Sequence, residues 1–230
     1  MQLPAPLIEG RLLKRYKRFL ADIELADGTV VTAHTPNTGS MSQCAIPGYP
    51  VLISANDDPK RKLKFTLELI RVNDHWVDTH TQRTNRIVEE ALLSDNIAEF
   101  TGYRLQREFR YGASRIDFYL EKAEEKLLLE VKNVTLCQDA VARFPDAVTT
   151  RGQKHLLELK EAVSQGYAGV IFFLIQRAEA TSFSPADDID PEYGRLLREV
   201  VAAGVVPLAY KAITCPRENR IGARIPVVLA

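Results

Sequence analysis

The chain has 230 residues, of which 46% are hydrophobic and 26% charged, and its formal net charge is zero. This length accommodates one large domain or two small ones, and the composition is that of a soluble globular protein. The longest apolar run, residues 170–175, is too short to span a membrane. Zero net charge excludes a protein that coats nucleic acid by bulk charge alone, so phosphate binding would depend on local basic patches.

The N-terminus and the cysteines indicate the cytoplasm. The first residues, Met-Gln-Leu-Pro-Ala-Pro, lack the basic and apolar regions of a signal peptide. Cys44, Cys137 and Cys215 are odd in number and widely spaced, so they predict neither a disulfide framework nor a zinc site. We therefore expect a cytoplasmic protein without a membrane partner.

Residues 1–80 have the pattern of a small all-β domain. Strands are predicted over residues 7–13, 18–25, 30–34, 51–56 and 63–72, and Asp27-Gly28 is a strong hairpin-turn signal between the second and third. Five short strands in so few residues favour an OB-like β-barrel, a fold that often binds single-stranded nucleic acid. The strand count alone would suit any other small β-barrel equally well.

Two basic runs in this barrel are candidate nucleic-acid contacts. The first has Tyr16 and Phe19 interleaved with its cations, as in a surface that combines phosphate contacts with base stacking. The alternative is a pair of solvated charged faces. The cations are Arg11, Lys14, Arg15, Lys17 and Arg18 in the first run, and Lys60, Arg61, Lys62 and Lys64 in the second.

Residues 81–230 alternate between helix and strand patterns. Apolar residues at helical spacing predict a helix over residues 84–100, with a buried stripe centred near Ala91. Glu90 lies at the border of that stripe and could reach a site between helix and sheet, whereas Glu89 points away. An exposed ion pair is the alternative role for Glu90.

The central feature of this half is a predicted hairpin over residues 114–132. With its turn centred between Ala123 and Glu124, Asp117 lies opposite Glu130 and Arg115 lies opposite Lys132. Opposed residues in an antiparallel pair have Cβ atoms about 5 Å apart, and side chains alternate between faces. Asp117, Glu130 and Lys132 are therefore expected on one face, and Ile116, Phe118, Leu129 and Val131 on the other, apolar face.

Two opposed carboxylates repel each other unless a cation lies between them. Mg²⁺ binds one or two carboxylates together with waters and phosphate oxygens. A nearby Lys132 could orient or deprotonate a water, or neutralise charge on a phosphate. The pattern resembles that of the PD-(D/E)XK nuclease superfamily. The alternative is an amphipathic surface hairpin in which Arg115 and Lys132 neutralise the acids.

The remaining elements complete an α/β domain. A second helix is predicted from about residue 149 to Gly166, and Arg151, Lys154 and His155 near its start are placed to meet phosphate, although a lone His is commonly structural. Strands at 170–175 and 206–212 flank a helix at 191–203. We expect an α+β two-domain protein: residues 1–80 form the barrel, and residues 81–230 form an α/β domain with a mixed sheet.

Several motifs in order resemble the sugar fermentation stimulation protein A family, over essentially the whole chain. They are residues 16–20 (Tyr-Lys-Arg-Phe-Leu), 36–39 (Pro-Asn-Thr-Gly), 115–118 (Arg-Ile-Asp-Phe), 130–132 (Glu-Val-Lys), 144–147 (Phe-Pro-Asp-Ala) and 151–156 (Arg-Gly-Gln-Lys-His-Leu). The resemblance implies an OB-like domain joined to a PD-(D/E)XK nuclease-like domain, DNA binding, and a link to the regulation of sugar utilisation.

By position, the resemblance places Asp117, Glu130 and Glu90 as metal-binding acids and Lys132 as the catalytic lysine, with Mg²⁺ or Mn²⁺ as cofactor. The proline of the superfamily motif is replaced by Ile116. The first hypothesis is a DNA-binding protein with a metal-dependent phosphodiesterase site, for which RNA is an open alternative substrate. The second is a non-catalytic DNA-binding regulator that keeps only the nuclease fold, and the third is a small-molecule binding module.

Overall fold

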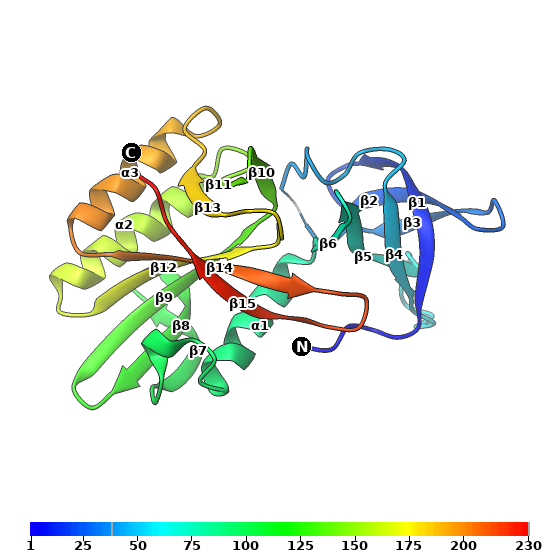
Figure 1. Cartoon of the computed structure of the whole chain (residues 1–230). Helices are drawn as coiled ribbons and strands as arrows, with labels where there is room; N and C mark the ends of the chain where they lie inside the picture. The colour runs from blue at the N-terminus through cyan, green and yellow to red at the C-terminus, as the bar shows by residue number, and fades with distance from the viewer. Residues whose placement is uncertain (38, 230) are drawn as a thin grey trace.

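The computed structural model describes residues 1–37 and 39–229, so Thr38 of the 36–39 motif lies outside the described residues. Two lobes lie side by side, a β-barrel from the first third of the chain and an α/β lobe from the rest (Figure 1). The barrel lobe contains β1 (Leu7–Tyr16), β2 (Leu20–Leu25), β3 (Val30–His34), β4 (Pro50–Ala55), β5 (Phe65–Val72) and β6 (His75–Asp78).

The barrel confirms the predicted OB-like fold. Its strands pair in the order β3-β2-β1-β4-β5-β6, and a parallel contact between β3 and β5 closes the first five. The predicted turn joins β2 to β3, since the Gly28 N–H donates to the Leu25 carbonyl at 3.0 Å. Gly28 has φ +82°, a conformation that glycine adopts without strain. Leu12, Ile23 and Ile53 are fully buried in the barrel core.

The α/β lobe is built on a mixed six-stranded sheet, as expected, in the order β15-β14-β12-β9-β8-β7. Strands β9, β12 and β14 are parallel, and the edges on both sides are antiparallel. The elements are α1 (Thr81–Leu93), a 3₁₀ turn (Ala98–Phe100), β7 (Arg104–Tyr111), β8 (Ser114–Lys122), β9 (Glu125–Val134), β10 (Leu136–Gln138), β11 (Val141–Phe144), α2 (Thr150–Ser164), β12 (Ala168–Ile175), β13 (Ser182–Pro185), α3 (Pro191–Ala202), β14 (Val206–Thr214) and β15 (Asn219–Ile225).

Helices cover both faces of this sheet, α2 and α3 on one and α1 on the other (Figure 1). The expectation of one apolar and one polar face for the hairpin is therefore wrong. Leu128 packs under α2 and α3, whereas Leu129 packs under α1. Ile116 and Phe118 also join opposite cores, although they are only two residues apart on β8.

The first helix is shorter than its apolar pattern predicted. It ends at Leu93, and the chain turns at Asp95, which has φ +53°. Ile97 is buried, but it lies after the turn and not on the helix. Its position in the helical spacing of apolar residues is therefore a coincidence. The short or charged strands β6, β7, β10, β11, β13 and β15 were not predicted, because each lacks a long apolar or alternating run.

A buried ion cluster fixes the two lobes to each other. Arg83 on α1 donates to Asp78 at 2.9 Å and to Glu68, and all three side chains are at most 5% exposed. Asn219 on β15 also donates to Asp78, at 3.0 Å. The β14–β15 hairpin thus reaches the barrel lobe, as Figure 1 shows.

No helix within residues 1–37 and 39–229 is long and apolar enough to cross a membrane. All three cysteines are free. Cys44 and Cys137 are buried, and the Cys44 thiol donates to the Thr135 carbonyl at 3.4 Å across the boundary between the lobes.

Candidate functional site

The β8–β9 hairpin has the predicted register. Phe118 pairs with Leu129, and Lys122 pairs with Glu125 next to the turn. The ladder ends at the Phe118–Leu129 pair, one step before the two acids. Beyond it, β8 stays paired with β7 and β9 stays paired with β12. The two strands therefore separate where Asp117 and Glu130 would have met.

This separation changes the partner of Arg115. Its cross-strand neighbour is Arg110 on β7, not Lys132 as the hairpin rule predicted. Both arginines are exposed. Lys132 is consequently free of a cationic neighbour on β8 and turns toward Glu130.

The Asp117 carboxylate lies where the strands part. Its Oδ2 accepts a hydrogen bond from the Val131 N–H at 2.8 Å, in place of a backbone carbonyl of β8. Its Oδ1 accepts from Asn85 Nδ2 on α1 at 2.7 Å. Burial, together with the charge of Glu130, raises the pKa of Asp117 to about 6, against the opposing effects of these donors and of Lys132. The two acids are thus close enough to repel each other.

Glu130 is buried to 3% exposure and is held on one side only, by Lys132 and His155. Its Oε1 accepts from Lys132 Nζ at 2.7 Å and contacts His155 Nδ1, whereas Oε2 is buried with no partner in the described part of the chain. Burial alone would raise its pKa, but the Lys132 charge and the His155 hydrogen bond outweigh burial and lower the pKa to about 2. Glu130 is therefore an anion with one oxygen unused.

His155 supports Glu130 from α2. The Thr149 hydroxyl caps this helix by accepting from the Gly152 N–H at 3.0 Å, which sets its first turn beside β9. Arg151 Nε donates to His155 Nε2 at 3.4 Å, so a neutral ring carries its proton on Nδ1 and donates to Glu130. Lys154 is turned away and pairs with Glu158 at 3.5 Å.

Lys132 lies in a cleft of about 620 Å³ between the two lobes. Asp117 and Glu130 lie beneath its lining, hydrogen-bonded to Asn85, Val131 and Lys132. The lining that bears on binding is Arg15, Arg18, Asn37 and Gly39 from the barrel lobe, and Asn85, Lys132, Asn133 and Asp146 from the α/β lobe. Neither lobe alone forms this cleft.

Arg15 has a different role from the predicted phosphate contact. Its guanidinium donates to the carbonyls of Asn37 at 2.8 Å, Gly39 at 3.0 Å and Ser40 at 3.0 Å, and also to that of Arg18. Desolvation by burial lowers its pKa. Arg15 therefore holds the loop that forms one wall of the cleft.

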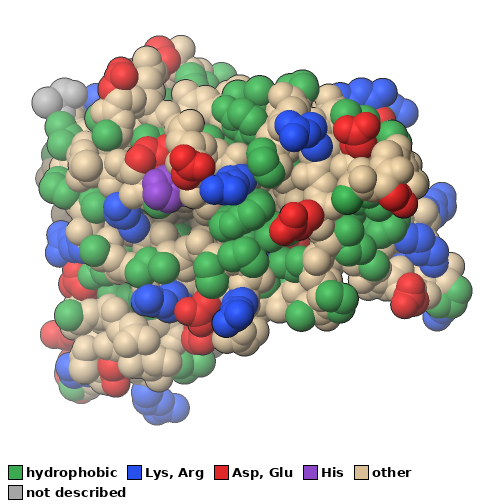
Figure 2. Space-filling model, turned by 45° about the vertical axis from the view of Figure 1, so that its right-hand side comes forward, with side chains coloured by type: hydrophobic (Ala, Val, Ile, Leu, Met, Phe, Trp, Pro, Cys, Tyr) green, Lys and Arg blue, Asp and Glu red, His purple; other side chains and the backbone are tan. Residues whose placement is uncertain are grey.

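The other predicted nucleic-acid contacts are spread over the barrel. Arg18 is exposed in the β1–β2 turn and lines the cleft, and Arg61 lines an adjoining cavity. The remaining cations of the two basic runs, namely Arg11, Lys14, Lys17, Lys60, Lys62 and Lys64, line neither space. Figure 2 shows cationic and anionic side chains interspersed over one face, as expected for a chain without net charge.

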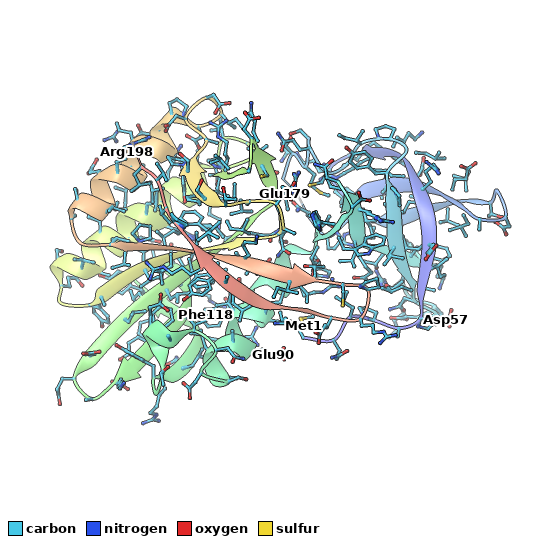
Figure 3. All side chains as sticks on the ribbon, in the orientation of Figure 1. Met1, Asp57, Glu90, Phe118, Glu179 and Arg198 are labelled. Carbon is cyan, nitrogen blue, oxygen red and sulfur yellow. The ribbon has the colours of Figure 1, made fainter. Side chains whose placement is uncertain are left out.

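Glu90 does not join the acid pair, contrary to its predicted position. Its carboxylate is 58% exposed and pairs with the Met1 ammonium at 2.7 Å (Figure 3). Asn85 contacts Asp117 instead. Five residues separate Asn85 from Glu90, about 140° around a helix, so the two lie on opposite borders of the buried stripe. Periodicity alone could not distinguish these borders.

The acid pair fits a hard divalent ion. Among residues 1–37 and 39–229, no group of three or more His, Cys, Asp or Glu side chains is arranged to hold a metal. Mg²⁺, however, is commonly held by one or two carboxylates, with waters and phosphate oxygens completing its shell. The unpartnered Glu130 Oε2 and the repulsion that helps to raise the pKa of Asp117 both fit a divalent cation between the two carboxylates.

Asp117→Asn should stabilise the metal-free protein at pH 7.5. An aspartate whose pKa rises on folding, here from 3.8 to about 6, binds protons more tightly when folded, so its contribution to stability falls as pH rises through about 6. Because one pKa unit corresponds to about 1.4 kcal/mol, we expect a gain of about 1–3 kcal/mol in the free energy of unfolding by urea. The gain should shrink toward pH 4.

Asp22→Asn is the matched control, for which we expect a change of opposite sign in the free energy of unfolding. Hydrogen bonds from Thr32 and Tyr16 lower the pKa of Asp22, so this substitution should destabilise the protein at pH 7.5. Equal destabilisation by both substitutions would contradict the assignment of repulsion at Asp117.

Two protein-family models match the chain, "SfsA N-terminal OB domain" over residues 13–78 and "Sugar fermentation stimulation protein RE domain" over residues 82–218. The sugar fermentation stimulation protein homolog of Syntrophotalea carbinolica is 62% identical over 230 residues, covering 100% of both chains. That of Geobacter sulfurreducens is 52% identical and covers 99% of both.

Among solved structures, that of Pyrococcus furiosus SfsA in complex with Ca²⁺ matches with a TM-score of 0.90 and 25% identity, covering 99% of this chain and 98% of that one. Its similarity extends over both lobes, and the sequence matches above extend over the full chain. The chain therefore belongs to the sugar fermentation stimulation protein family, as its motifs predicted.

Proposed function

We propose that this protein binds DNA and cleaves phosphodiester bonds with Mg²⁺ or Mn²⁺, with RNA as an alternative substrate. The observation that carries the proposal is the pair of acids at the point where β8 and β9 separate, with Glu130 Oε2 left without a partner. A solved relative in complex with Ca²⁺ supports a divalent-cation site in this family. The family name, sugar fermentation stimulation protein, is the ground for proposing a role in the regulation of sugar utilisation.

Asp117 and Glu130 would hold the ion. A bound divalent ion polarises phosphate oxygens and lowers the pKa of a bound water. His155 keeps Glu130 oriented from α2, and Asn85 does the same for Asp117 from α1. Such supporting contacts commonly decide how well carboxylates bind a metal.

Lys132 would act on the substrate. Its Nζ lies 2.7 Å from Glu130 and lines the cleft, so its ammonium can position an attacking water beside the phosphate. The same charge stabilises the extra negative charge of the pentavalent transition state. Arg18 and Arg151, both exposed near the cleft, are candidates to contact neighbouring phosphates.

The proposal is tested by incubating purified protein with single- and double-stranded DNA and RNA in Mg²⁺ or Mn²⁺. Cleavage should require the metal and stop in EDTA. A Glu130→Gln variant should lose cleavage and also lose Ca²⁺ binding measured by calorimetry. Intact substrates under every metal condition would refute the catalytic proposal.

A second candidate is a DNA-binding regulator that keeps only the nuclease fold. One observation favours it: Glu90 pairs with the Met1 ammonium, so Asp117 and Glu130 have no third acid beside them among the described residues. This candidate predicts salt-sensitive DNA binding that Asp117→Ala leaves unchanged or strengthens, since removing a carboxylate lowers repulsion of phosphate.

A further inference from the structure

A second cavity, of about 920 Å³, adjoins the cleft that holds Lys132. Asn37 and Thr81 line both spaces, so the two adjoin at these residues. Thr81 is fixed there by two hydrogen bonds to the Pro36 carbonyl, from its N–H at 3.2 Å and from its hydroxyl at 3.1 Å. A chain-like ligand leaving the cleft across this bridge enters the second cavity.

One wall of the cavity is formed by the barrel lobe. Phe19 comes from the β1–β2 loop, Arg61 from the β4–β5 loop, and His34 and Thr35 from the end of β3. OB-folds bind oligonucleotides and oligosaccharides with one face of the barrel and with these two loops. The opposite wall is the first turns of α1, including Arg86. Here the barrel wall is therefore roofed by the second lobe.

The walls carry groups that suit a nucleotide. Phe19 is 47% exposed, although it is a large apolar side chain. Arg86 is exposed and forms no hydrogen bond or ion pair with any described residue, and Arg61 reaches only Thr66, at 3.1 Å. An aromatic face with two cations is the combination that stacks a base and holds its phosphate.

Buried polar atoms point to a ligand independently of this charge pattern. Thr35 is fully buried, and its hydroxyl has no partner within the described residues. His80 Nδ1, also on the lining, is buried and unpartnered there too. Buried hydroxyl and imidazole groups are normally hydrogen-bonded, so each lacks a partner that a base edge could provide. Oligosaccharide would supply the same hydrogen bonds but no anion for the two arginines.

The size of both spaces distinguishes a single strand from a duplex. Cavities of about 300–1,000 Å³ enclose ligands of drug size. That class includes one or two nucleotides, whereas a base of duplex DNA would have to leave its stack to enter a cavity of this size. Stacking on Phe19 also requires an unpaired base.

We propose, on the basis of the phosphodiesterase function proposed above, that the substrate is single-stranded nucleic acid. Its scissile phosphate lies in the cleft at Lys132. The nucleotide next to it crosses the Asn37–Thr81 bridge and stacks its base on Phe19, with its phosphate at Arg61 and Arg86.

The test measures binding by fluorescence anisotropy, with a labelled 15-nucleotide oligo(dT) and a labelled 15-base-pair duplex, in Ca²⁺. A gel run afterwards checks that the oligonucleotides are still of full length. The single strand should bind at least tenfold more tightly than the duplex. Phe19→Ala should weaken its binding about tenfold, as expected when one stacked base is lost. Arg86→Gln should weaken it too and reduce the salt slope by about one.

Val30→Ala is the matched control, since Val30 is an exposed apolar residue of β3 that lines neither space. It should leave both affinities unchanged. Duplex binding as tight as single-strand binding, or no effect of Phe19→Ala, would overturn the subsite. Oligo(dT) binding that depends on Phe19 without any cleavage in Mg²⁺ would uphold the subsite and refute only the catalytic proposal. Cleavage of duplex DNA that Phe19→Ala leaves unchanged would uphold the catalytic proposal and refute the subsite.

Discussion

Lys132→Met should lower the rate of Mg²⁺-dependent cleavage by about 10²–10³-fold, the loss seen when one group that stabilises transition-state charge is removed. The side chain is 11% exposed and its Nζ lies 2.7 Å from Glu130, so the substitution removes a fixed charge and not a mobile surface group. Methionine fills a similar space. The measurement is single-turnover cleavage of an oligonucleotide at saturating protein.

Metal binding should survive this substitution. Removing a cation beside two acids leaves more negative charge for a divalent ion, so Ca²⁺ should bind Lys132→Met at least as tightly as the native protein, by calorimetry. Lys154→Met is the control, since that lysine is 54% exposed and paired with Glu158. If Lys154→Met were as inactive as Lys132→Met, the loss of cleavage could not be assigned to the cleft. Full activity of Lys132→Met would exclude a catalytic lysine.

Arg83→Met should destabilise the protein by about 3–5 kcal/mol, because removing one member of a buried ion cluster leaves its partners as uncompensated charges. Glu68 and Asp78 are 3% and 1% exposed, and Arg83 lies between them. For a chain of this size each kcal/mol shifts Tm by about 2–4 °C, so the expected loss is on the order of 10 °C. Urea and thermal unfolding measure it.

The pH dependence of this variant gives a second readout. Burial raises the pKa of Asp78 and Arg83 opposes this, so without Arg83 Asp78 should bind its proton still more tightly in the folded protein, and the variant should regain stability as pH falls toward 5. Glu68→Gln added to Arg83→Met should also recover part of the loss. Arg86→Met, one turn along the same helix and exposed, should change stability by less than about 0.5 kcal/mol. A loss below 1 kcal/mol for Arg83→Met would contradict the role of the cluster.

The Arg83 cluster also bears on function, because it fixes the barrel lobe to α1. The cleft takes one wall from each lobe, and Asn85, which holds Asp117, lies two residues after Arg83. A change in the relative position of the two lobes would change the shape of the cleft while leaving the core of each lobe intact. Cleavage by Arg83→Met should therefore fall even at temperatures where the variant remains folded.

Local rules sufficed for much of the candidate site. Turn chemistry and strand alternation placed Asp117, Glu130 and Lys132 on one hairpin with the correct register, because a hairpin is fixed by contacts between residues close in sequence. The barrel and the mixed sheet followed from strand spacing and from the apolar run at residues 170–175, for the same reason.

Other parts depended on contacts that no local pattern contains. Glu90 and Asn85 border the same buried stripe equally, and only the position of Met1 on one side and of Asp117 on the other gives them different roles. Arg15 belongs to a basic run in sequence, yet its guanidinium is engaged by the backbone carbonyls of Asn37 and Gly39. His155 became a partner of Glu130 because α2 packs on β9.

The amino-acid sequence by itself determined the two domains, the acid–acid–lysine hairpin and the family. The tertiary structure alone decided where the hairpin ladder stops, which side of α1 faces the acids, and how two lobes enclose a cleft and a second cavity. The division has one physical cause. Backbone geometry and side-chain periodicity act over a few residues, whereas burial and charge pairing act between segments that only the completed fold brings into contact.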